Sequence, residues 1–473
     1  MKKTFIEEAF KPDGVEAQSG GEPPVEASLT DAEAYRAHVR REAEKALTKV
    51  AEEMARLEAE SIRIARDGEA DAGALGWKEL PTAQEPLTMP ESAQQNRNVD
   101  FGAYRTHLCL VSEQAAANFL PIVLHRPENV VLFVSEKMKE AADMLEQAVR
   151  TASPTTKVHR CGVENPNDDE EVSDKVYEQL DAFAATNPIV NVTGGTKLMA
   201  FGALTAAYGA GFPAFYLNQE DNRISILRSG SGRHREVVSP IEVRLNLKTY
   251  LAAYGYEAGS GALPSLTYDE EQFIGELIKS ATLHEVVPAL NALAVDAKDK
   301  PGLTIEISGI GAGREEAFKT LCDYFRSSGH LQIRGRTLKF PTEADRFFVA
   351  GGWLERYVCG LLTRMNFRPQ ANLVVRNQVK NEIDVALMHD GRFCIVECKT
   401  GRLDKIEEAN KVIYKLETLK KLGGLNTRLI LVTYQALQPE SLARARKSGI
   451  RVIAVDSPAQ LQSALRSGIT EKK

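Results

Sequence analysis

The sequence lacks the features of a membrane protein, a secreted protein or a cysteine-based metal protein. In its 473 residues no stretch approaches the roughly 18 uninterrupted apolar residues that a membrane span needs. The first residues include two lysines, but no apolar core follows them as it would in a secretory signal. The six cysteines are scattered, and none forms a Cys-x-x-Cys pair. We therefore expect reduced thiols, a cytoplasmic location and no membrane contact.

Two phosphate-binding fingerprints are also missing. The chain has neither a Walker A loop nor a GxGxxG turn. Walker A loops hold the phosphates of ATP, and GxGxxG turns hold the pyrophosphate of dinucleotide cofactors. Their absence disfavours an ATPase and a dehydrogenase.

Charge is distributed unevenly along the chain. Residues 1–100 hold 13 Lys and Arg against 21 Asp and Glu, whereas residues 340–473 hold 22 against 14. A basic C-terminal third within an acidic chain suits a polyanionic substrate in that region. An ordinary solvated surface would account for the charge as well.

The chain divides by pattern into four segments. The first contains a Gly-, Pro-, Glu- and Ser-rich start that we expect to be disordered, a helix over about 31–67 and a linker. The helix has its apolar residues spaced alternately four and three apart, which fits either a coiled-coil contact or a solitary amphipathic helix. The segments are an N-terminal extension (1–100), an α/β domain (101–240), a mainly helical connector that could be winged-helix-like (241–345) and a second α/β domain (346–473).

The second segment alternates short apolar strands with helices. This alternation predicts a parallel, doubly wound sheet. The predicted strands are 106–112, 129–135, 157–161, 188–195 and 213–218.

Two stretches of this segment supply candidate ligand-binding residues. Thr193, Gly194, Gly195, Thr196 and Lys197 connect a strand to a helix. Glycines let main-chain N–H groups approach an anion, and the helix N-terminus adds partial positive charge. A plain strand-to-helix turn would use the same residues.

The first predicted strand delivers polar side chains to the same edge of the sheet. Ser112, Gln114 and Asn118 follow that strand in the sequence. Ligands of open α/β sheets bind at the carboxyl ends of the strands. We therefore expect both stretches to line one ligand site.

The strongest chemical signal lies in the last segment, in residues 381–401 (NEIDVALMHDGRFCIVECKTG). Two strands flank Asp390-Gly391, which is the preferred loop of a two-residue hairpin. With that loop, Asp384 faces Glu397 directly, and Lys399 projects from the same face.

Two opposed carboxylates repel each other unless a cation lies between them. A hard divalent ion, Mn²⁺ or Mg²⁺, would take Asp384 and Glu397 as ligands and would activate water for phosphodiester hydrolysis. Lys399 could position that water or stabilise developing charge. Glu355, on the preceding predicted helix (346–364), is a candidate further acid, and Lys415 could contact phosphate. Solvated side chains on a hairpin and on helix surfaces would explain the same residues.

These motifs resemble known families. A helix with Glu355, then D…ExK on a hairpin, then a helix resembles the restriction-endonuclease-like PD-(D/E)xK superfamily. The phrases GGWLERYV, NEIDV and ECKTG together resemble the nuclease half of CRISPR-associated CARF-nuclease effectors. The resemblance implies Asp384 and Glu397 as metal ligands, Lys399 as the catalytic lysine and Glu355 as a supporting acid.

The stretches THLCLVSEQ…ANFLP and NVTGGTKLMAFGA resemble the ligand motifs of CARF domains, which have a Rossmann-like fold and recognise cyclic oligoadenylates of type III CRISPR systems. The resemblance implies an endonuclease activated by a cyclic oligoadenylate, with cyclic tetra-adenylate as the expected activator. Its expected substrate is single-stranded nucleic acid, DNA or RNA, or DNA that it nicks. A two-fold symmetric cyclic ligand favours a homodimer. The alternative is a non-catalytic, nucleotide-sensing regulator that binds DNA through the connector, where Arg334 and Arg336 flank a predicted hairpin turn.

Overall fold

The computed structural model describes residues 100–220, 223–228, 236–238, 245–260 and 264–471. The chain separates into two units, Met1–Glu91 and Ser92–Lys473, and everything below concerns the second. The expected disordered start, the helix over 31–67 and the linker lie outside the described residues. None of the helices in the described ranges is long and apolar enough to cross a membrane.

The first α/β domain is built on a seven-stranded sheet of order β3-β2-β1-β4-β5-β6-β7. Its first five strands are parallel, and β6 and β7 are added antiparallel at one edge. The predicted doubly wound sheet is therefore confirmed. The strands are β1 (Thr106–Leu110), β2 (Asn129–Ser135), β3 (Lys157–Val163), β4 (Pro188–Asn191), β5 (Ala214–Asn218), β6 (Arg223–Leu227) and β7 (Glu236–Val238).

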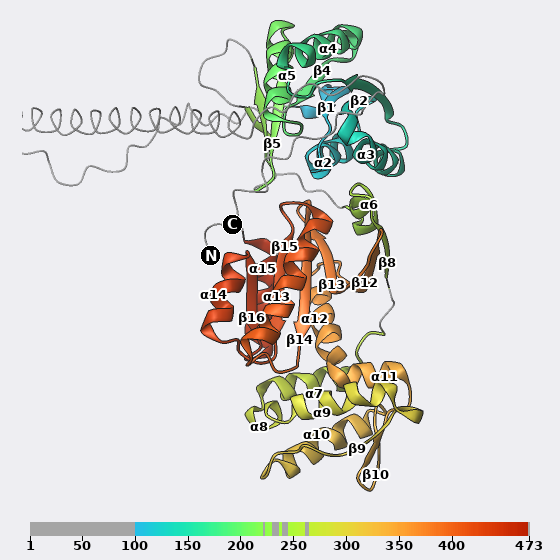
Figure 1. Cartoon of the computed structure of the whole chain (residues 1–473), viewed down its shortest axis with the longest axis vertical. Helices are drawn as coiled ribbons and strands as arrows, with labels where there is room; N and C mark the ends of the chain where they lie inside the picture. The colour runs from blue at the N-terminus through green and yellow to red at the C-terminus, as the bar shows by residue number, and fades with distance from the viewer. Residues whose placement is uncertain (1–99, 221–222, 229–235, 239–244, 261–263, 472–473) are drawn as a thin grey trace, which may run out of the picture. The chain divides into compact units, whose positions relative to one another are not determined.

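Helices cover both faces of this sheet (Figure 1). On one face α2 (Ala116–His125) packs against α3 (Lys139–Ala152), and on the other α4 (Asp169–Ala182) packs against α5 (Lys197–Gly209). The strand order reverses between β1 and β4, because the chain proceeds from β1 to β2 on one side and from β4 to β5 on the other. The loops after β1 and β4 therefore diverge and leave a crevice at their carboxyl ends.

The second α/β domain has a six-stranded sheet of order β16-β15-β14-β13-β12-β8. Strands β14, β15 and β16 are parallel, whereas β8, β12, β13 and β14 pair antiparallel. The strands are β8 (Glu257–Ser260), β12 (Gln370–Arg376), β13 (Lys380–His389), β14 (Arg392–Lys399), β15 (Arg428–Thr433) and β16 (Ile450–Ala454). The helices are α6 (Leu247–Ala252), α11 (Glu343–Phe347), α12 (Trp353–Arg364), α13 (Ile406–Lys420), α14 (Pro439–Lys447) and α15 (Pro458–Thr470).

The structure corrects two expectations for this domain. The single helix expected over 346–364 is interrupted by a π-helical segment, Phe348–Gly352, in which Gly351 has a φ of 127°. The sequence also predicts one hairpin over 372–398, whereas the structure has a three-stranded meander of β12, β13 and β14 there. The final helix α15 has no counterpart among the predicted elements.

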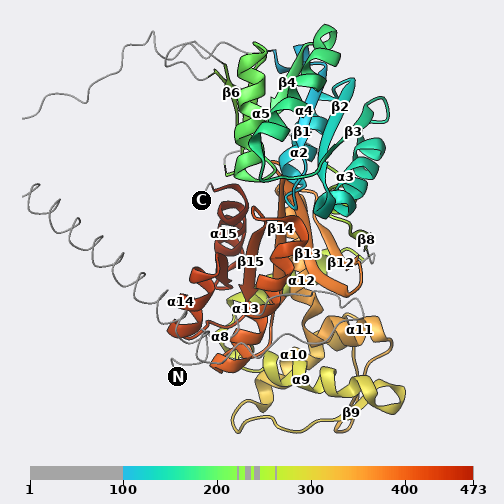
Figure 2. The same cartoon turned by 45° about the horizontal axis from the view of Figure 1, so that its top comes forward.

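Most of the connector is helical, as expected. It contains α7 (Tyr268–Lys279), α8 (Ala281–His284), α9 (Val287–Asp296) and α10 (Glu315–Ser327). The hairpin expected near Arg334 forms from β10 (Gln332–Arg334) and β11 (Thr337–Lys339), and β9 (Thr304–Glu306) completes a small sheet. The figures place these elements beside the six-stranded sheet (Figures 1 and 2). Strand β8, also from 241–345, pairs with β12 and so belongs to that larger sheet.

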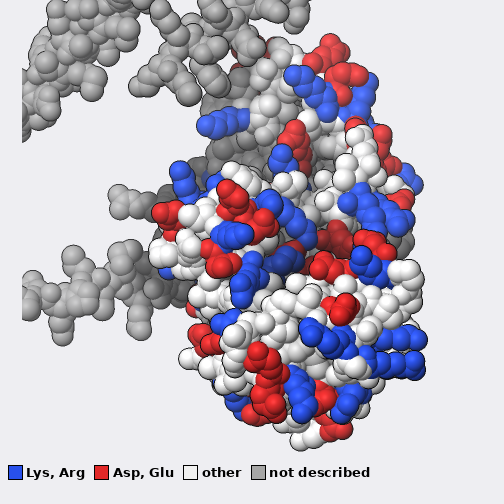
Figure 3. Space-filling model, turned by 60° about the horizontal axis from the view of Figure 1, so that its bottom comes forward, with Lys and Arg blue, Asp and Glu red and all other residues white. Residues whose placement is uncertain are grey.

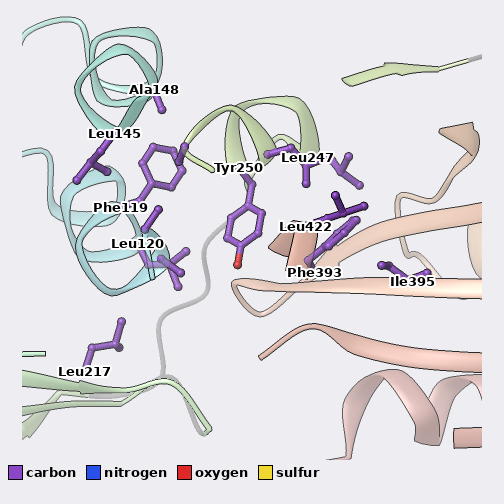
Figure 4. Packing of buried hydrophobic residues seen from close by; sticks show 14 of the residues in the cluster. Phe119, Leu120, Leu145, Ala148, Leu217, Leu247, Tyr250, Phe393, Ile395 and Leu422 are labelled. Carbon is purple, nitrogen blue, oxygen red and sulfur yellow. The ribbon is translucent and has the colours of Figure 1, made fainter. Parts of the chain in front are cut away.

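The helix α6 contributes an aromatic side chain to one continuous apolar cluster. Tyr250 is buried with Phe119 and Leu120 of α2 and with Phe393 of β14 (Figure 4). Its hydroxyl donates to the carbonyl oxygen of Gly423 at 2.8 Å. This hydrogen bond satisfies the one polar atom that Tyr250 brings into the cluster.

Candidate active site and ligand pocket

The β13–β14 hairpin has the register that the sequence predicts. Val385 pairs with Val396, and His389 pairs with Arg392. The two loop residues, Asp390 and Gly391, have φ values of 47° and 69°, as a type I′ turn requires. The same register, continued by one residue, sets Asp384 opposite Glu397.

The side chains of these two residues converge with two lysines. Lys399 Nζ lies 2.6 Å from Glu397 Oε1 and 3.4 Å from Asp384 Oδ2. Lys415 Nζ, from α13, lies 2.6 Å from the same Glu397 oxygen. The main-chain N–H of Cys398 donates to Asp384 Oδ2 at 2.8 Å. The structure thus brings together the predicted Asp384, Glu397 and Lys399, and adds Lys415.

The carboxylates of this cluster are removed from water. Glu397 is fully buried and Asp384 is 8% exposed. Burial raises the pKa of Asp384, and the nearby Glu397 adds to the rise while Lys399 opposes it. Burial acts to lower the pKa of Lys399, but Asp384 and Glu397 outweigh it, so this pKa is raised. The lysine therefore keeps its positive charge beside the carboxylates.

Glu355 reaches this cluster from the first turn of α12. It is 8% exposed, and burial, with the charge of Asp384, raises its pKa to about 8. The approach of α12 depends on Gly351, because a Cβ there would lie 2.2 Å from Thr400 Oγ1. Glu355 thus lies near Asp384 and Glu397, and its role as a further acid stays a prediction.

The cluster can accept a divalent cation. Among the residues that the structure describes, no group of three or more His, Cys, Asp or Glu is arranged to hold a metal ion. Magnesium, however, is commonly held by one or two carboxylates, with water and substrate phosphate as its other ligands. Glu397 Oε2 and Glu355 Oε2 are buried and have no hydrogen-bond partner among the described residues. Unsatisfied buried carboxylate oxygens are costly, and a cation would satisfy them.

A pocket of about 690 Å³ lies at the carboxyl ends of β1 and β4 in the first sheet. Six of the predicted ligand residues line it, namely Ser112, Gln114, Thr193, Gly194, Gly195 and Thr196. Sequence reasoning missed the residues that β2, β5 and the loops beside them contribute, although Ser135 and Asn218 end two strands that the sequence predicts. They are Ser135, Lys137, Met138, Pro166, Asn167 and the stretch 216–220.

Two predicted residues are not among those that line the pocket. Asn118 is buried, donates to the carbonyl oxygen of Leu110 at 2.7 Å and accepts from Asn191 Nδ2 at 2.8 Å. It therefore ties the ends of β1 and β4 together. Lys197 is exposed at the first position of α5.

The glycine-rich turn is shaped by close packing. A Cβ on Gly194 would lie 2.4 Å from the carbonyl oxygen of Leu110, so a larger residue cannot fit without a shift of backbone. Thr196 caps α5, since its side chain accepts from the N–H of Met199 at 3.1 Å. The helix thus begins directly at the pocket, where its partial positive charge favours an anion.

Family models match both α/β domains. The model of the Card1 CARF domain matches residues 106–250, and the model of the Card1-like endonuclease domain matches residues 342–471. The chain joins a Card1 CARF domain to a Card1-like endonuclease domain. The resemblance inferred from the sequence motifs is confirmed, and the cluster around Asp384 lies within the endonuclease domain.

Solved structures share the fold. Can2 from Sulfobacillus thermosulfidooxidans, in complex with cyclic tetra-adenylate, is 24% identical with a TM-score of 0.63, over 78% of this chain and 98% of that one. Protein VC1899 from Vibrio cholerae is 19% identical with a TM-score of 0.65, over 77% of this chain and 97% of that one. No curated protein matches the chain.

The endonuclease domain contributes to the CARF pocket. Leu425, in the loop between α13 and β15, lies among the residues that line it. Its main-chain N–H donates to Gln114 Oε1 at 3.0 Å. The next residue, Asn426, donates from Nδ2 to Gln219 Oε1 at 3.2 Å. The loop that follows the helix of Lys415 therefore contacts two residues of the pocket.

Proposed function

We propose that this protein is a metal-dependent endonuclease whose activity is controlled by a cyclic oligoadenylate, in type III CRISPR defence. The observation that carries the catalytic part is the convergence of Asp384, Glu397 and Lys399 on one face of a tight hairpin. Its proposed substrate is single-stranded nucleic acid, or DNA that it nicks.

Asp384 and Glu397 would hold Mn²⁺ or Mg²⁺, which when bound polarises the phosphoryl oxygen and lowers the pKa of water. Lys399 orients the attacking water and stabilises charge that develops on the phosphate. Lys415 fixes the orientation of Glu397 through its 2.6 Å contact. Glu355, with a pKa of about 8, keeps its proton near neutral pH in the metal-free chain and so adds no third negative charge.

The CARF pocket would bind the activator, and cyclic tetra-adenylate is the first candidate because Can2 was solved with that ligand. The pocket presents a helix N-terminus and a glycine-rich turn to the phosphates. A cyclic ligand with two-fold symmetry is best matched by two copies of the pocket, and so we propose a homodimer. The activator acts by favouring one arrangement of the chain over another.

The test is a cleavage assay with labelled single-stranded DNA and RNA, Mn²⁺ or Mg²⁺, and cyclic oligoadenylates of several ring sizes. We expect cleavage that needs both the metal and one ring size. Cleavage that persists in the Asp384→Ala, Glu397→Ala double variant would refute the proposed site. Cleavage that is equal with and without every activator would refute the control by the CARF domain.

The second candidate function is a nucleotide-sensing regulator that binds duplex DNA through the connector. It is favoured by the β10–β11 hairpin, whose turn exposes Arg334 and Arg336. A gel shift of duplex DNA without metal, together with no cleavage under any condition, would support it. This function leaves the cluster of Asp384, Glu397 and Lys399 without a role.

A further inference from the structure

The helix α13 presents an exposed aromatic residue next to the active-site cluster. Tyr414 is 52% exposed, and it immediately precedes Lys415, whose Nζ contacts Glu397. Lys411, one helical turn earlier, is also exposed. A single strand of nucleic acid that leaves the cluster across α13 would therefore contact lysines first and an aromatic ring next.

The ring of Tyr414 is held by an arginine from the neighbouring helix α14. The guanidinium carbon of Arg444 lies 4.0 Å from the ring centroid. Arg444 Nε is buried and has no hydrogen-bond partner among the described residues. An arginine stacked in this way fixes the ring and polarises it, and aromatic–arginine pairs of this kind bind unpaired bases in single-stranded nucleic acid.

A groove of about 730 Å³ lies between α13 and α14 beside Arg444. Asn410 and Arg444 line it, and Asn410 Oδ1 is the second buried polar atom there without a partner in the described chain. Glu417 and Glu440 lie in the same groove as Arg444 and Lys447, so the charged side chains that line it balance. The groove therefore suits an uncharged base with hydrogen-bonding edges better than it suits the charged sugar-phosphate backbone of a nucleic acid.

On the face of the molecule shown in Figure 3, Lys and Arg side chains are intermixed with Asp and Glu side chains, with no single basic field. This face therefore exerts little long-range electrostatic attraction on a nucleic acid. Local contacts, such as stacking, have to supply more of the affinity.

We propose that Tyr414, braced by Arg444, is a stacking platform for a base of the single-stranded substrate, close to the phosphate that is cleaved at Asp384 and Glu397. The proposal rests on the proposed nuclease function and identifies an unpaired base as the part of the substrate that the enzyme recognises. Lys411 and Lys415 contact the sugar-phosphate backbone, and the base stacks on the exposed side of the Tyr414 ring, away from Arg444. The site is therefore specific for unpaired bases and not for duplex.

The test compares two 12-nucleotide strands of equal charge, one with all its bases and one with abasic positions in the centre. Binding is measured by fluorescence anisotropy with the Asp384→Asn protein, with Mg²⁺ and cyclic tetra-adenylate present. We expect the base-containing strand to bind about 5- to 150-fold more tightly, the range for one stacked base. In the additional variant Tyr414→Ala the two strands should bind alike, whereas Tyr414→Phe should keep the preference.

Tyr177 on α4 is the matched control, because it is 53% exposed and far along the chain from the cluster. Tyr177→Ala should leave the preference intact. The platform is refuted if Tyr414→Ala keeps the preference, or if the parent protein shows none. A fall in melting temperature in Tyr414→Ala without a change in preference would show that the ring only joins two helices, which also refutes it.

Failure of the platform can be told apart from failure of the nuclease assignment. If wild-type protein cleaves with metal and activator but Tyr414→Ala cleaves single strands with unchanged KM and kcat, only the platform is wrong. If the wild-type protein cleaves nothing under any condition, the nuclease assignment is wrong.

Discussion

The two sheets of this protein both place polar residues at strand ends, but they do so with opposite chemistry. At the end of β1 and β4 the CARF pocket is lined by glycines, hydroxyls and amides, and by a helix N-terminus. Within the antiparallel pair β13 and β14, the endonuclease domain buries Asp384 and Glu397 beside two lysines. The first site is suited to bind a ligand, and the second is suited to catalyse a reaction of a bound substrate.

The difference lies in which polar atoms are satisfied. Asn118 and Thr196, at the edges of the CARF pocket, form complete hydrogen bonds within the protein. In the endonuclease cluster, oxygens of Glu355 and Glu397 remain buried without partners in the described chain. A binding site can be stable when empty, whereas a site for metal chemistry leaves part of its charge to be neutralised by what it binds.

The largest expected effect separates activity from binding. Asp384→Asn removes a proposed metal ligand but keeps the shape of the side chain. We expect cleavage to fall by about 10²- to 10⁴-fold, because metal catalysis contributes several kcal/mol to the transition state. Binding of cyclic tetra-adenylate, measured by calorimetry, should be unchanged. A loss of activator binding would show that the two sites are not chemically separate.

The next effect concerns the lysine that contacts both carboxylates. Lys399→Gln should reduce kcat by about 10²- to 10³-fold, as for removal of one charge-stabilising donor. Lys279→Gln is the control, since Lys279 pairs with Glu276 on an exposed face of α7. Equal activity in the two variants would argue against a catalytic role for Lys399.

The third effect is on the CARF side. Gly194→Ala places a methyl group against the carbonyl oxygen of Leu110, and we expect a loss of about 1–3 kcal/mol of unfolding free energy with weaker activator binding. Gly209→Ala, at the end of α5, is the matched control because its Cβ would meet nothing within 4 Å. Thermal melts and calorimetry on both variants measure the difference. If Gly194→Ala melts and binds like the control, the close packing of the turn is not what shapes the pocket.

A fourth effect, on stability alone, is a dependence of CARF stability on pH. Burial lowers the pKa of His107 to about 3 and that of His125 to about 4, from the ordinary value of 6.5. Below pH 6.5 these histidines bind protons in the unfolded chain but not in the folded chain. The folded state therefore loses stability as the pH falls from 6.5 toward 4. The loss approaches about 1.4 kcal/mol per pH unit for each histidine.

Melting temperatures between pH 7 and pH 4 test this dependence. His107→Leu should reduce it, with His125 still contributing, whereas replacement of an exposed histidine on the same sheet, His159→Gln, should not. An unchanged pH dependence in His107→Leu would mean that other groups set the acid stability of the domain.

The sequence predicted most where local chemistry decides the structure. The Asp390-Gly391 turn fixes the hairpin register, and hence the opposition of Asp384 and Glu397, without help from distant residues. The alternation of strands and helices likewise predicted the doubly wound sheet. In both cases the pattern is set by residues that are close together in the chain.

The sequence predicted least where distant segments meet. Lys415 resembled a solvated helix residue, because only the packing of α13 on the sheet brings it to Glu397. The break at Gly351 was missed because it depends on the close approach of Thr400, which follows β14. Asn118 was placed in the pocket by its position after β1, but its amide is used to join β1 to β4.

The hydrogen bond between Gln114 and Leu425 links the CARF pocket to the endonuclease domain. An occupant of the pocket that displaces Leu425 from the oxygen of Gln114 would free the loop that follows α13 from this hydrogen bond. If binding in the pocket and binding in the endonuclease domain are coupled through this contact, the coupling is reciprocal, and a bound metal or nucleic-acid strand would alter the affinity for the proposed activator by the same factor. Binding of the substrate would in that case strengthen or weaken the binding of the activator that switches the enzyme on.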